Sequence, residues 1–332
     1  MIARRRFSPI GNDDTVYLRS DRTSTIVHRW GRSASPREET TTMTTNILVP
    51  IDGSAHSYGG VVYAARSFPS ATITALYVVD VERDWYQGPG MPGPWEEVAR
   101  ETAEGYHERA IEWARQYDTD IETETVFGVP HRQILEHVVD HDIDHVVMGS
   151  HGRSPITRPF VGHVAEAVAR RAPVSVTIVP ETVADVESWD LPGRILVAVD
   201  GSDRASMALE YALSRFPGAS ITIVHAIDLG VDYDHEDLEG TYVEELLGTL
   251  RERADELLAA AAEHAADHDG DVQTAAIHGK PAPSIVSYGT ENGFDQIVMG
   301  SHGRSGLGRV LLGSVAEAVA QRSPISVTIV RE

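Results

Sequence analysis

The sequence has no cysteine, which excludes disulfide bridges and thiolate metal sites. It has almost no lysine: Lys280 stands alone beside 27 arginines, and the formal net charge is −22. It also has no long apolar run, because stretches such as VSVTIV are far too short to span a bilayer. These features argue against a transmembrane protein and against binding to nucleic acid or to an anionic membrane surface.

The strong negative charge is tolerated most easily in concentrated salt, where screening relieves the repulsion between like charges. We therefore expect a halophilic, cytoplasmic protein, with an acidic protein from a GC-rich bacterium as the alternative. Residues 1–43 differ, since they hold eight arginines and five acidic residues and leave about −25 for the rest. No apolar segment follows their ARRRF start, so we predict a disordered basic extension rather than an export signal, with Met43 as a candidate translation start.

What the sequence does contain is an internal repeat. The octapeptide VMGSHGRS occurs at 147–154 and again at 298–305. Matching flanks are NILVPIDGS (46–54) with RILVAVDGS (194–202), and VAEAVARRAPVSVTIV (164–179) with VAEAVAQRSPISVTIV (315–330). The duplication predicts two domains at 44–180 and 194–332, which we call half one and half two, joined by a linker at 181–193.

Each half alternates apolar strand patterns with helical patterns, in the order β-α-β-α-β-α-β-α-β. Apolar strands joined by helical crossovers predict an α/β fold, in which each half is a five-stranded, mainly parallel sheet with helices on both faces. The last strand of each half, at 174–179 and 325–330, has an apolar edge that needs a cover. We predict that these strands meet across a pseudo-twofold axis as an intrachain pseudo-dimer, and whole chains could also pair as a homodimer.

The repeated loop has the composition of an anion site. In half two it leaves a strand at Gly300, turns through Gly303 and enters a helix near Gly313 and Ser314. Glycines let backbone N–H groups point into one concavity, and a helix N-terminus adds partial positive charge. With Arg304 beside them, these groups predict a phosphate site. The glycine spacing matches neither the P-loop nor G-x-G-x-x-G.

An acidic residue follows the first strand of each half, Asp52 in half one and Asp200 in half two. Ligands of doubly wound folds bind at the carboxyl ends of the strands, so each acid should face the glycine loop of its own half. There it could bond a ribose hydroxyl or a base. The alternative is that each Asp-Gly-Ser stretch caps the helix that follows, and both roles can coexist.

The spacing Gly300-x2-Gly303-x9-Gly313-Ser314, together with VMGSHGRSG and the final ISVTIV strand, resembles the nucleotide-binding pattern of the universal stress protein family. The resemblance covers about 45–180 and 193–331 and implies two Rossmann-like (adenine nucleotide alpha hydrolase-like) domains, in a haloarchaeal-type member given the composition. It implies ATP-binding roles for Ala198, Asp200, Ala226, Gly300, Gly303, Arg304, Gly313 and Ser314. Many members have proline where this chain has Ala198.

The loop of half one differs from that of half two where the phosphate would lie. Pro155 replaces Gly306, His163 replaces Ser314, and Pro159 is a second proline of the loop. Each proline deletes a backbone donor and fixes φ, so the concavity should lose hydrogen bonds and shape. We therefore predict a degenerate site that keeps the fold but not ATP. Its residues are Pro50, Asp52, Val78, Gly149, Gly152 and Gly162.

The resemblance implies an ATP-binding sensor or regulator of the stress response, with Mg²⁺ or Mn²⁺ beside the triphosphate and at most slow ATP hydrolysis. One alternative is a nucleotidyl-transfer or ATP-hydrolysing enzyme on the same fold, although the usual His-x-Gly-His and Ser-Gly-Gly-x-Asp-Ser signatures are absent from the sequence. Another is a nucleotide-free interaction module whose glycines serve only the fold. In each case the protein partners are not identified by the residues.

Several histidines have spacings that metal ligands can have. His141 and His145 lie four residues apart, as do His264 and His268. Neither pair has a third ligand in its sequence context, so we predict solvent-exposed structural roles and no metal site. His151 and His302 lie inside the repeated loop, where we expect hydrogen bonds that stabilise the turn rather than catalysis, because no paired nucleophile is apparent.

Overall fold

The structure is a computed structural model of the chain. It describes residues 15–20, 23–28, 45–80, 95–152, 161–180, 193–228, 241–265, 272–302 and 312–331. Within these ranges, no helix combines the length and the apolar character needed to cross a membrane.

The two halves have the same order of elements, as predicted. Half one contains β3 (Asn46–Ile51), α1 (Ala55–Ser67), β4 (Thr72–Val79), α3 (Trp95–Arg115), β5 (Ile121–Phe127), α4 (Pro130–Asp140), β6 (His145–Gly149), α5 (His163–Arg171) and β7 (Ser175–Val179). Half two contains β8 (Arg194–Ala198), α7 (Asp203–Arg215), β9 (Ser220–Ile227), α8 (Thr241–Ala265), β10 (Val272–His278), α9 (Pro281–Glu291), β11 (Gln296–Gly300), α10 (Ser314–Arg322) and β12 (Ser326–Val330).

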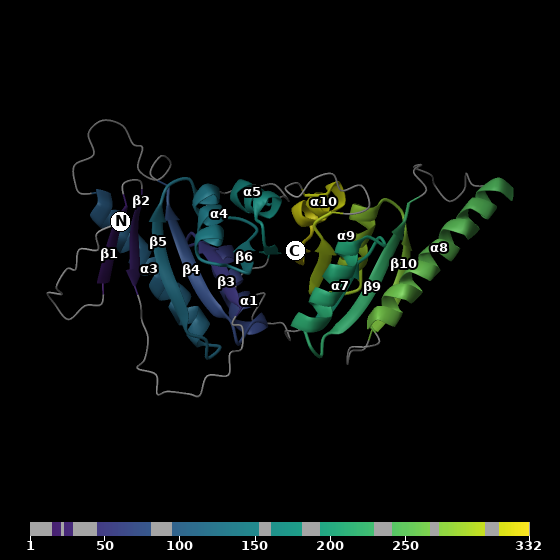
Figure 1. Cartoon of the computed structure of the whole chain (residues 1–332), viewed down its shortest axis with the longest axis horizontal. Helices are drawn as coiled ribbons and strands as arrows, with labels where there is room; N and C mark the ends of the chain where they lie inside the picture. Colours follow the sequence, from purple (N-terminus) through teal and green to yellow (C-terminus); the bar gives the residue numbers. More distant parts are fainter. Residues whose placement is uncertain are drawn as a thin grey trace, which may run out of the picture.

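Each half forms a five-stranded parallel sheet, and the two sheets join into one. The strand order is β5-β4-β3-β6-β7 in half one, continued by β12-β11-β8-β9-β10 in half two (Figure 1). All pairs within a half are parallel, whereas β7 and β12 pair antiparallel at the seam between the halves. The prediction that the last strands meet is confirmed by this pairing.

Residues 1–43 contain regular structure that the sequence analysis did not predict. β1 (Thr15–Ser20) and β2 (Thr23–His28) form an antiparallel hairpin, and β2 pairs with β5 at the edge of the sheet. The expectation of a disordered extension is therefore corrected for these two strands. Their sequences, TVYLRS and TSTIVH, are rich in β-branched residues and are joined by two residues, a length typical of hairpins.

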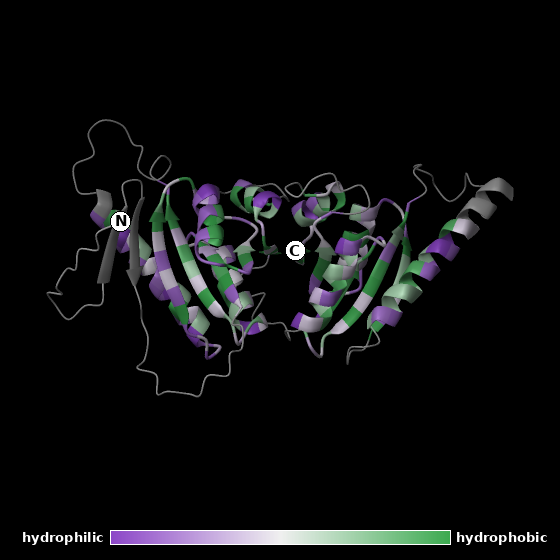
Figure 2. Ribbon diagram, viewed as in Figure 1, coloured by the Kyte–Doolittle hydropathy of each residue, from purple (hydrophilic) through white to green (hydrophobic). Residues whose placement is uncertain are grey.

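Helices cover both faces of the sheet, which confirms the predicted fold class. On one face, α4, α5, α9 and α10 pack on a single apolar cluster that is continuous across the two halves. On the other face, α1 and α3 cover a cluster of half one, and α7 and α8 cover a separate cluster of half two. Figure 2 shows the hydrophobic residues concentrated on the strands and on the helix sides that meet them.

The seam between the halves contains a buried chain of hydrogen bonds. Thr177 of β7 lies opposite Thr328 of β12, and their hydroxyl oxygens are 2.7 Å apart. Toward half two, Gln296 Nε2 donates to Thr328 Oγ1 at 2.7 Å, and Tyr63 of α1 donates to Gln296 Oε1 at 2.7 Å. Toward half one, Thr177 Oγ1 lies 2.8 Å from His145 Nε2. Both threonine hydroxyls can therefore act as donor and acceptor at once, which satisfies the hydrogen bonding that buried polar groups require.

His145 occupies the place in half one that Gln296 has in half two. Its side chain is buried, and its Nδ1 lies 3.3 Å from the hydroxyl of Tyr211 of α7. Gln296 makes the equivalent contact with the hydroxyl of Tyr63 of α1. The prediction of a solvent-exposed role is wrong for His145, because strand β6 directs it into the seam. Burial, with a smaller contribution from Arg215, lowers the pKa of His145 to about 3.

The stability of the chain should therefore depend on pH through His145. Unfolding returns its pKa to about 6.5, so the unfolded state binds more protons below that pH and stability falls as the pH drops. Each pH unit costs on the order of 1.4 kcal/mol. His145→Gln, which copies Gln296 of half two, should leave stability near pH 8 almost unchanged and lose about 2 kcal/mol less than the parent between pH 8 and pH 5.

Urea unfolding of both chains at pH 8 and pH 5 measures this difference. If both chains lose the same stability on acidification, His145 is not the group that titrates. The next residue to substitute is then His137, the other buried histidine of half one with a strongly lowered pKa.

Candidate functional site

Each half has a pocket at the carboxyl end of its sheet, where the sequence placed the candidate site. In half two the pocket is lined by residues at or just after the carboxyl ends of β8, β9 and β11 and by the start of α10. In half one it is lined by the equivalent residues at or just after the ends of β3, β4 and β6 and by the start of α5. The cavity volume is about 260 Å³ in half two and about 120 Å³ in half one.

The structure brings the predicted residues of half two together. Those that line its pocket are Ala198, Asp200, Ala226, Gly300, Gly313 and Ser314. The other two, Gly303 and Arg304, lie outside the described residues. All six predicted residues of the half-one site line the other pocket: Pro50, Asp52, Val78, Gly149, Gly152 and Gly162. Residues far apart in the sequence thus meet at one edge because parallel strands end there together.

The Asp-Gly-Ser stretches divide two roles between their residues. The N-cap of α7 is Ser202, whose hydroxyl accepts from the backbone N–H of Ala205 at 3.3 Å. Asp200 Oδ1 in turn accepts from the Ser202 backbone N–H at 3.0 Å and from its hydroxyl at 2.6 Å. The serine is therefore the cap, and the aspartate is held at the edge of the pocket by the turn that the cap creates.

Gly300 serves close packing as well as lining the pocket. A Cβ at this position would lie 2.7 Å from the backbone oxygen of Arg204, in the first turn of α7. Gly149 is in the same relation to His56 in half one, at 2.6 Å. These strand-end glycines let the first helix of each half approach the fourth strand, so their presence alone does not indicate a phosphate.

The N-terminus of α10 lies at the pocket, which Gly313, Ser314 and Val315 line. Its N-cap is Gly313, which makes no side-chain cap, unlike Ser202 at the start of α7. The Gly313 N–H itself donates to the Ser301 carbonyl at 2.7 Å, which fixes how the chain enters the helix. The N–H groups of the first turn and the hydroxyl of Ser314 are then available to an anion.

Histidines stabilise the loop beside each pocket, as predicted. His151 Nδ1 lies 2.7 Å from the Ser150 hydroxyl, and His302 Nδ1 lies 3.3 Å from the Ser301 hydroxyl. Burial lowers the pKa of His302, and the guanidiniums of Arg204 and Arg331 lower it further. Its Nε2 is buried and finds no hydrogen-bond partner among the described residues.

The two pockets differ in charge. Among the described residues, the half-two pocket is lined by one carboxylate, Asp200, whereas that of half one is lined by Asp52 and Asp80. The helix start also differs, since α10 begins with Ser314 and α5 begins with His163. An anion would meet more negative charge in half one, and a histidine in place of the serine at the helix start.

Each pocket also has an apolar wall, which the sequence patterns did not predict. In half two it consists of Pro281 and Ile285 of α9 with Met299 of β11, and His225 of β9 also lines the pocket. His225 is held by a 2.8 Å contact between its Nδ1 and the Val199 carbonyl oxygen. The repeat held a usable signal, because PxxSI in GKPAPSI aligns with PxxQI in GVPHRQI, the stretch that forms the same wall in half one.

Comparison with known proteins agrees with this architecture. The family model described as the Universal stress protein family matches residues 43–180 and again residues 192–331. Universal stress protein Rv2005c of Mycobacterium tuberculosis is 26% identical over 304 residues, which cover 86% of this chain and 97% of that protein. Universal stress protein YxiE of Bacillus subtilis is 33% identical over 149 residues, which cover 42% of this chain and 98% of YxiE.

Among solved structures, a universal stress protein from Archaeoglobus fulgidus DSM 4304 superposes with a TM-score of 0.61. It is 24% identical and covers 87% of this chain and 99% of the other, so it shows that the fold is shared. The two matches of the family model account for most of the sequence, one in each half. The chain therefore belongs to the universal stress protein family, as a member with two copies of the family domain.

Proposed function

We propose that the chain is an ATP-binding stress-response regulator that holds its nucleotide in half two. The observation that carries this proposal is the pairing of a carboxylate, Asp200, with the uncapped N-terminus of α10 across one pocket. A carboxylate suits hydroxyl or amino donors of a nucleoside, and a helix N-terminus suits phosphate oxygens. A single ligand that carries both chemistries is a nucleotide.

The residues of the pocket indicate how ATP would lie. Asp200 and the backbone near Ala226 would contact the ribose or base, while the apolar wall of Ile285 and Met299 would cover the less polar part of the ligand. The phosphates would extend toward Gly313 and Ser314, where the backbone donors are. A divalent cation, Mg²⁺ or Mn²⁺, would accompany the triphosphate as part of the ligand.

Half two is the preferred half for three reasons. Its pocket has about twice the cavity volume, it carries one lining carboxylate instead of two among the described residues, and its helix begins with a serine. The sequence adds a fourth, since Pro155 and Pro159 remove backbone donors from the loop of half one. Half one would then serve mainly as the fixed partner of half two across the seam.

Calorimetric titration tests the proposal. The chain should bind one ATP, and Asp200→Ala should weaken ATP more than it weakens inorganic triphosphate, because this carboxylate contacts the nucleoside and not the phosphates. The matched control is Asp52→Ala, which makes the same change in half one and should leave ATP affinity unchanged. Two equivalent sites, or equal losses for ATP and triphosphate, would contradict the assignment of half two and of Asp200.

A further inference from the structure

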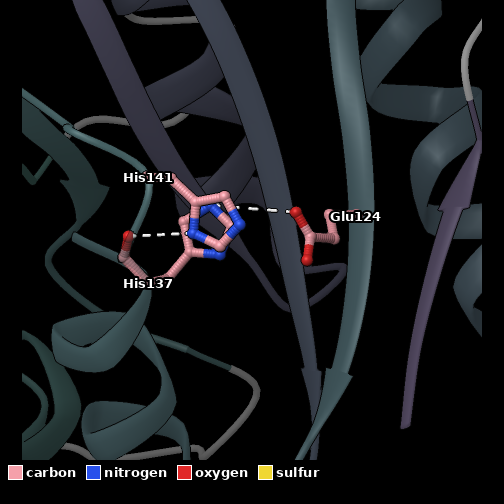
Figure 3. A group of neighbouring side chains, drawn as sticks. All are labelled: Glu124, His137 and His141. Atoms are coloured by element: carbon pink, nitrogen blue, oxygen red, sulfur yellow. Dashed lines mark hydrogen bonds and ion pairs between the residues drawn. The ribbon is translucent and has the colours of Figure 1, made fainter. Parts of the chain in front are cut away.

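A second group of ligand-type side chains lies in half one, outside both pockets. It consists of Glu124 on β5, His137 in the last turn of α4, and His141 at the C-cap of α4. Figure 3 shows the three side chains pointing toward one another between the helix and the sheet. One ligand atom from each lies within 4.8 Å of the other two. The four-residue spacing in the sequence paired His141 with His145. In the structure the neighbour of His141 is His137, one helical turn earlier.

The distance between the two buried members fits two ligands of one ion. His137 Nε2 lies 3.8 Å from Glu124 Oε2, which is too long for a hydrogen bond. Ligand atoms bound at 2.0–2.1 Å to a tetrahedral Zn²⁺ lie about 3.4 Å apart. The side chains of His137 and Glu124 are 4% and 10% exposed, so both are held in place by their surroundings.

His141 has the orientation that a ligand needs. Its Nδ1 lies 3.2 Å from the carbonyl oxygen of His137, to which an Nδ1–H would donate. That donation leaves the lone pair on Nε2, and metal-bound histidines commonly donate their other nitrogen to a backbone carbonyl in this way. The rings of His137 and His141 are stacked, with centroids 3.8 Å apart and planes 12° from parallel. Because His141 is exposed, it can move toward an ion and leave one position open to water.

The charges of the group call for a cation. The carboxylate of Glu124 and the imidazole of His137 are both buried, and their nearest oxygen and nitrogen are 3.8 Å apart, too far for a hydrogen bond. A buried carboxylate without a cation is costly, and a divalent ion between the three groups would offset that cost.

The fold does not require these three side chains. At the equivalent places half two has Ala275, Tyr288 and Asn292. Ala275 and Tyr288 are partly buried and pack against the apolar cluster of the sheet, and Tyr288 also contacts the ring of Phe294. The same helix–strand contact is thus made by apolar packing in half two, so the two histidines and the carboxylate are a feature of half one alone.

We propose that Glu124, His137 and His141 bind a divalent transition-metal ion, with Zn²⁺ as the best match to two imidazoles and one carboxylate. The ion joins the C-terminal end of α4 to β5. The opposite end of α4 carries Pro130 and Ile134, which line the half-one pocket, so the ion also steadies one wall of that pocket. The site is independent of ATP binding in half two.

Titration of the EDTA-treated full-length chain with Zn²⁺ tests the proposal. One ion should bind per chain, and Co²⁺ at the same site should give the visible absorption of a low-coordinate nitrogen and oxygen environment. His141→Asn, which installs the residue of half two, should lower Zn²⁺ affinity roughly 100-fold or more and abolish the Co²⁺ spectrum. Glu124→Gln should do the same.

Two controls separate loss of a ligand from loss of fold. His141 is exposed, so His141→Asn should unfold in urea like the parent when zinc is absent. His264→Asn removes another exposed helix histidine, whose Nε2 lies 3.3 Å from Glu210, and should leave Zn²⁺ affinity unchanged. The proposal would be overturned if the parent bound no zinc. It would also be overturned if His141→Asn and Glu124→Gln bound zinc as tightly as the parent.

Discussion

Placing the residues of half one in the loop of half two, as Gly306→Pro with Ser314→His, is expected to weaken ATP binding by two to four orders of magnitude. The proline removes a backbone donor and fixes φ near −65°, and the histidine removes the hydroxyl at the start of α10. Two lost hydrogen bonds to a charged ligand cost about 1.5–3 kcal/mol each, which gives that range. Gly306 lies outside the described residues, so its part rests on the sequence.

The reverse exchange in half one provides the control. Pro155→Gly with His163→Ser should leave the affinity of half two unchanged. Both exchanges should preserve the fold, because α5 and α10 start at equivalent residues and have glycine N-caps of nearly the same backbone geometry. Calorimetry measures both chains. If the half-two exchange binds ATP as the parent does, the phosphates do not lie at the start of α10.

The fold could be predicted from the sequence because the repeat tests every element twice. The stretch NILVPIDGS predicts a strand, which is observed as β3, and its repeat RILVAVDGS predicts the same strand in half two, which is observed as β8. The meeting of β7 and β12 was also predictable, since both have buried side chains on both faces and would otherwise expose an apolar edge. The hairpin of β1 and β2 was not predicted. The net charge of residues 1–43 indicated a disordered extension, and the two short stretches with β-branched residues were too weak a signal of strands to change that prediction.

The composition of the candidate pocket was predictable in its polar part only. Asp200 follows the strand β8 and Gly313 precedes a helix that follows β11, so the parallel topology alone places both at one edge of the sheet. The apolar wall could not, because Ile285 and Met299 look like any core residues until the pocket exists. The separation of roles in Asp-Gly-Ser also needed coordinates, since aspartate and serine are equally good caps by type.

The histidines show where spacing alone fails. His141 and His145 are four residues apart, but the helix ends at Asp140 and the chain enters β6, so the two side chains diverge. One becomes part of the exposed end of α4, and the other is buried in the seam beside Thr177. A spacing of four has meaning only within one helix, which is why the pair His137 and His141 is the one that meets.

The largest loss of stability is expected from Thr328→Asp, at the centre of the seam. Thr328 and Thr177 are both 0% exposed, and their hydroxyls form the middle link of the buried hydrogen-bond chain. An aspartate here would place an uncompensated charge among Thr177, Gln296 and the apolar residues of both halves. Leaving such a charge unpaired costs about 3–5 kcal/mol, a large fraction of the stability of an ordinary domain.

The control is Thr274→Asp, the same change on an exposed position of β10, which should alter the free energy of unfolding by less than about 0.5 kcal/mol. Urea unfolding monitored by circular dichroism measures both. Because the apolar cluster beneath the seam is continuous through β7 and β12, the loss in Thr328→Asp should appear in both halves together. A chain in which half two alone unfolds early would show that the seam joins two independent units, and that neither half depends on the other for its stability.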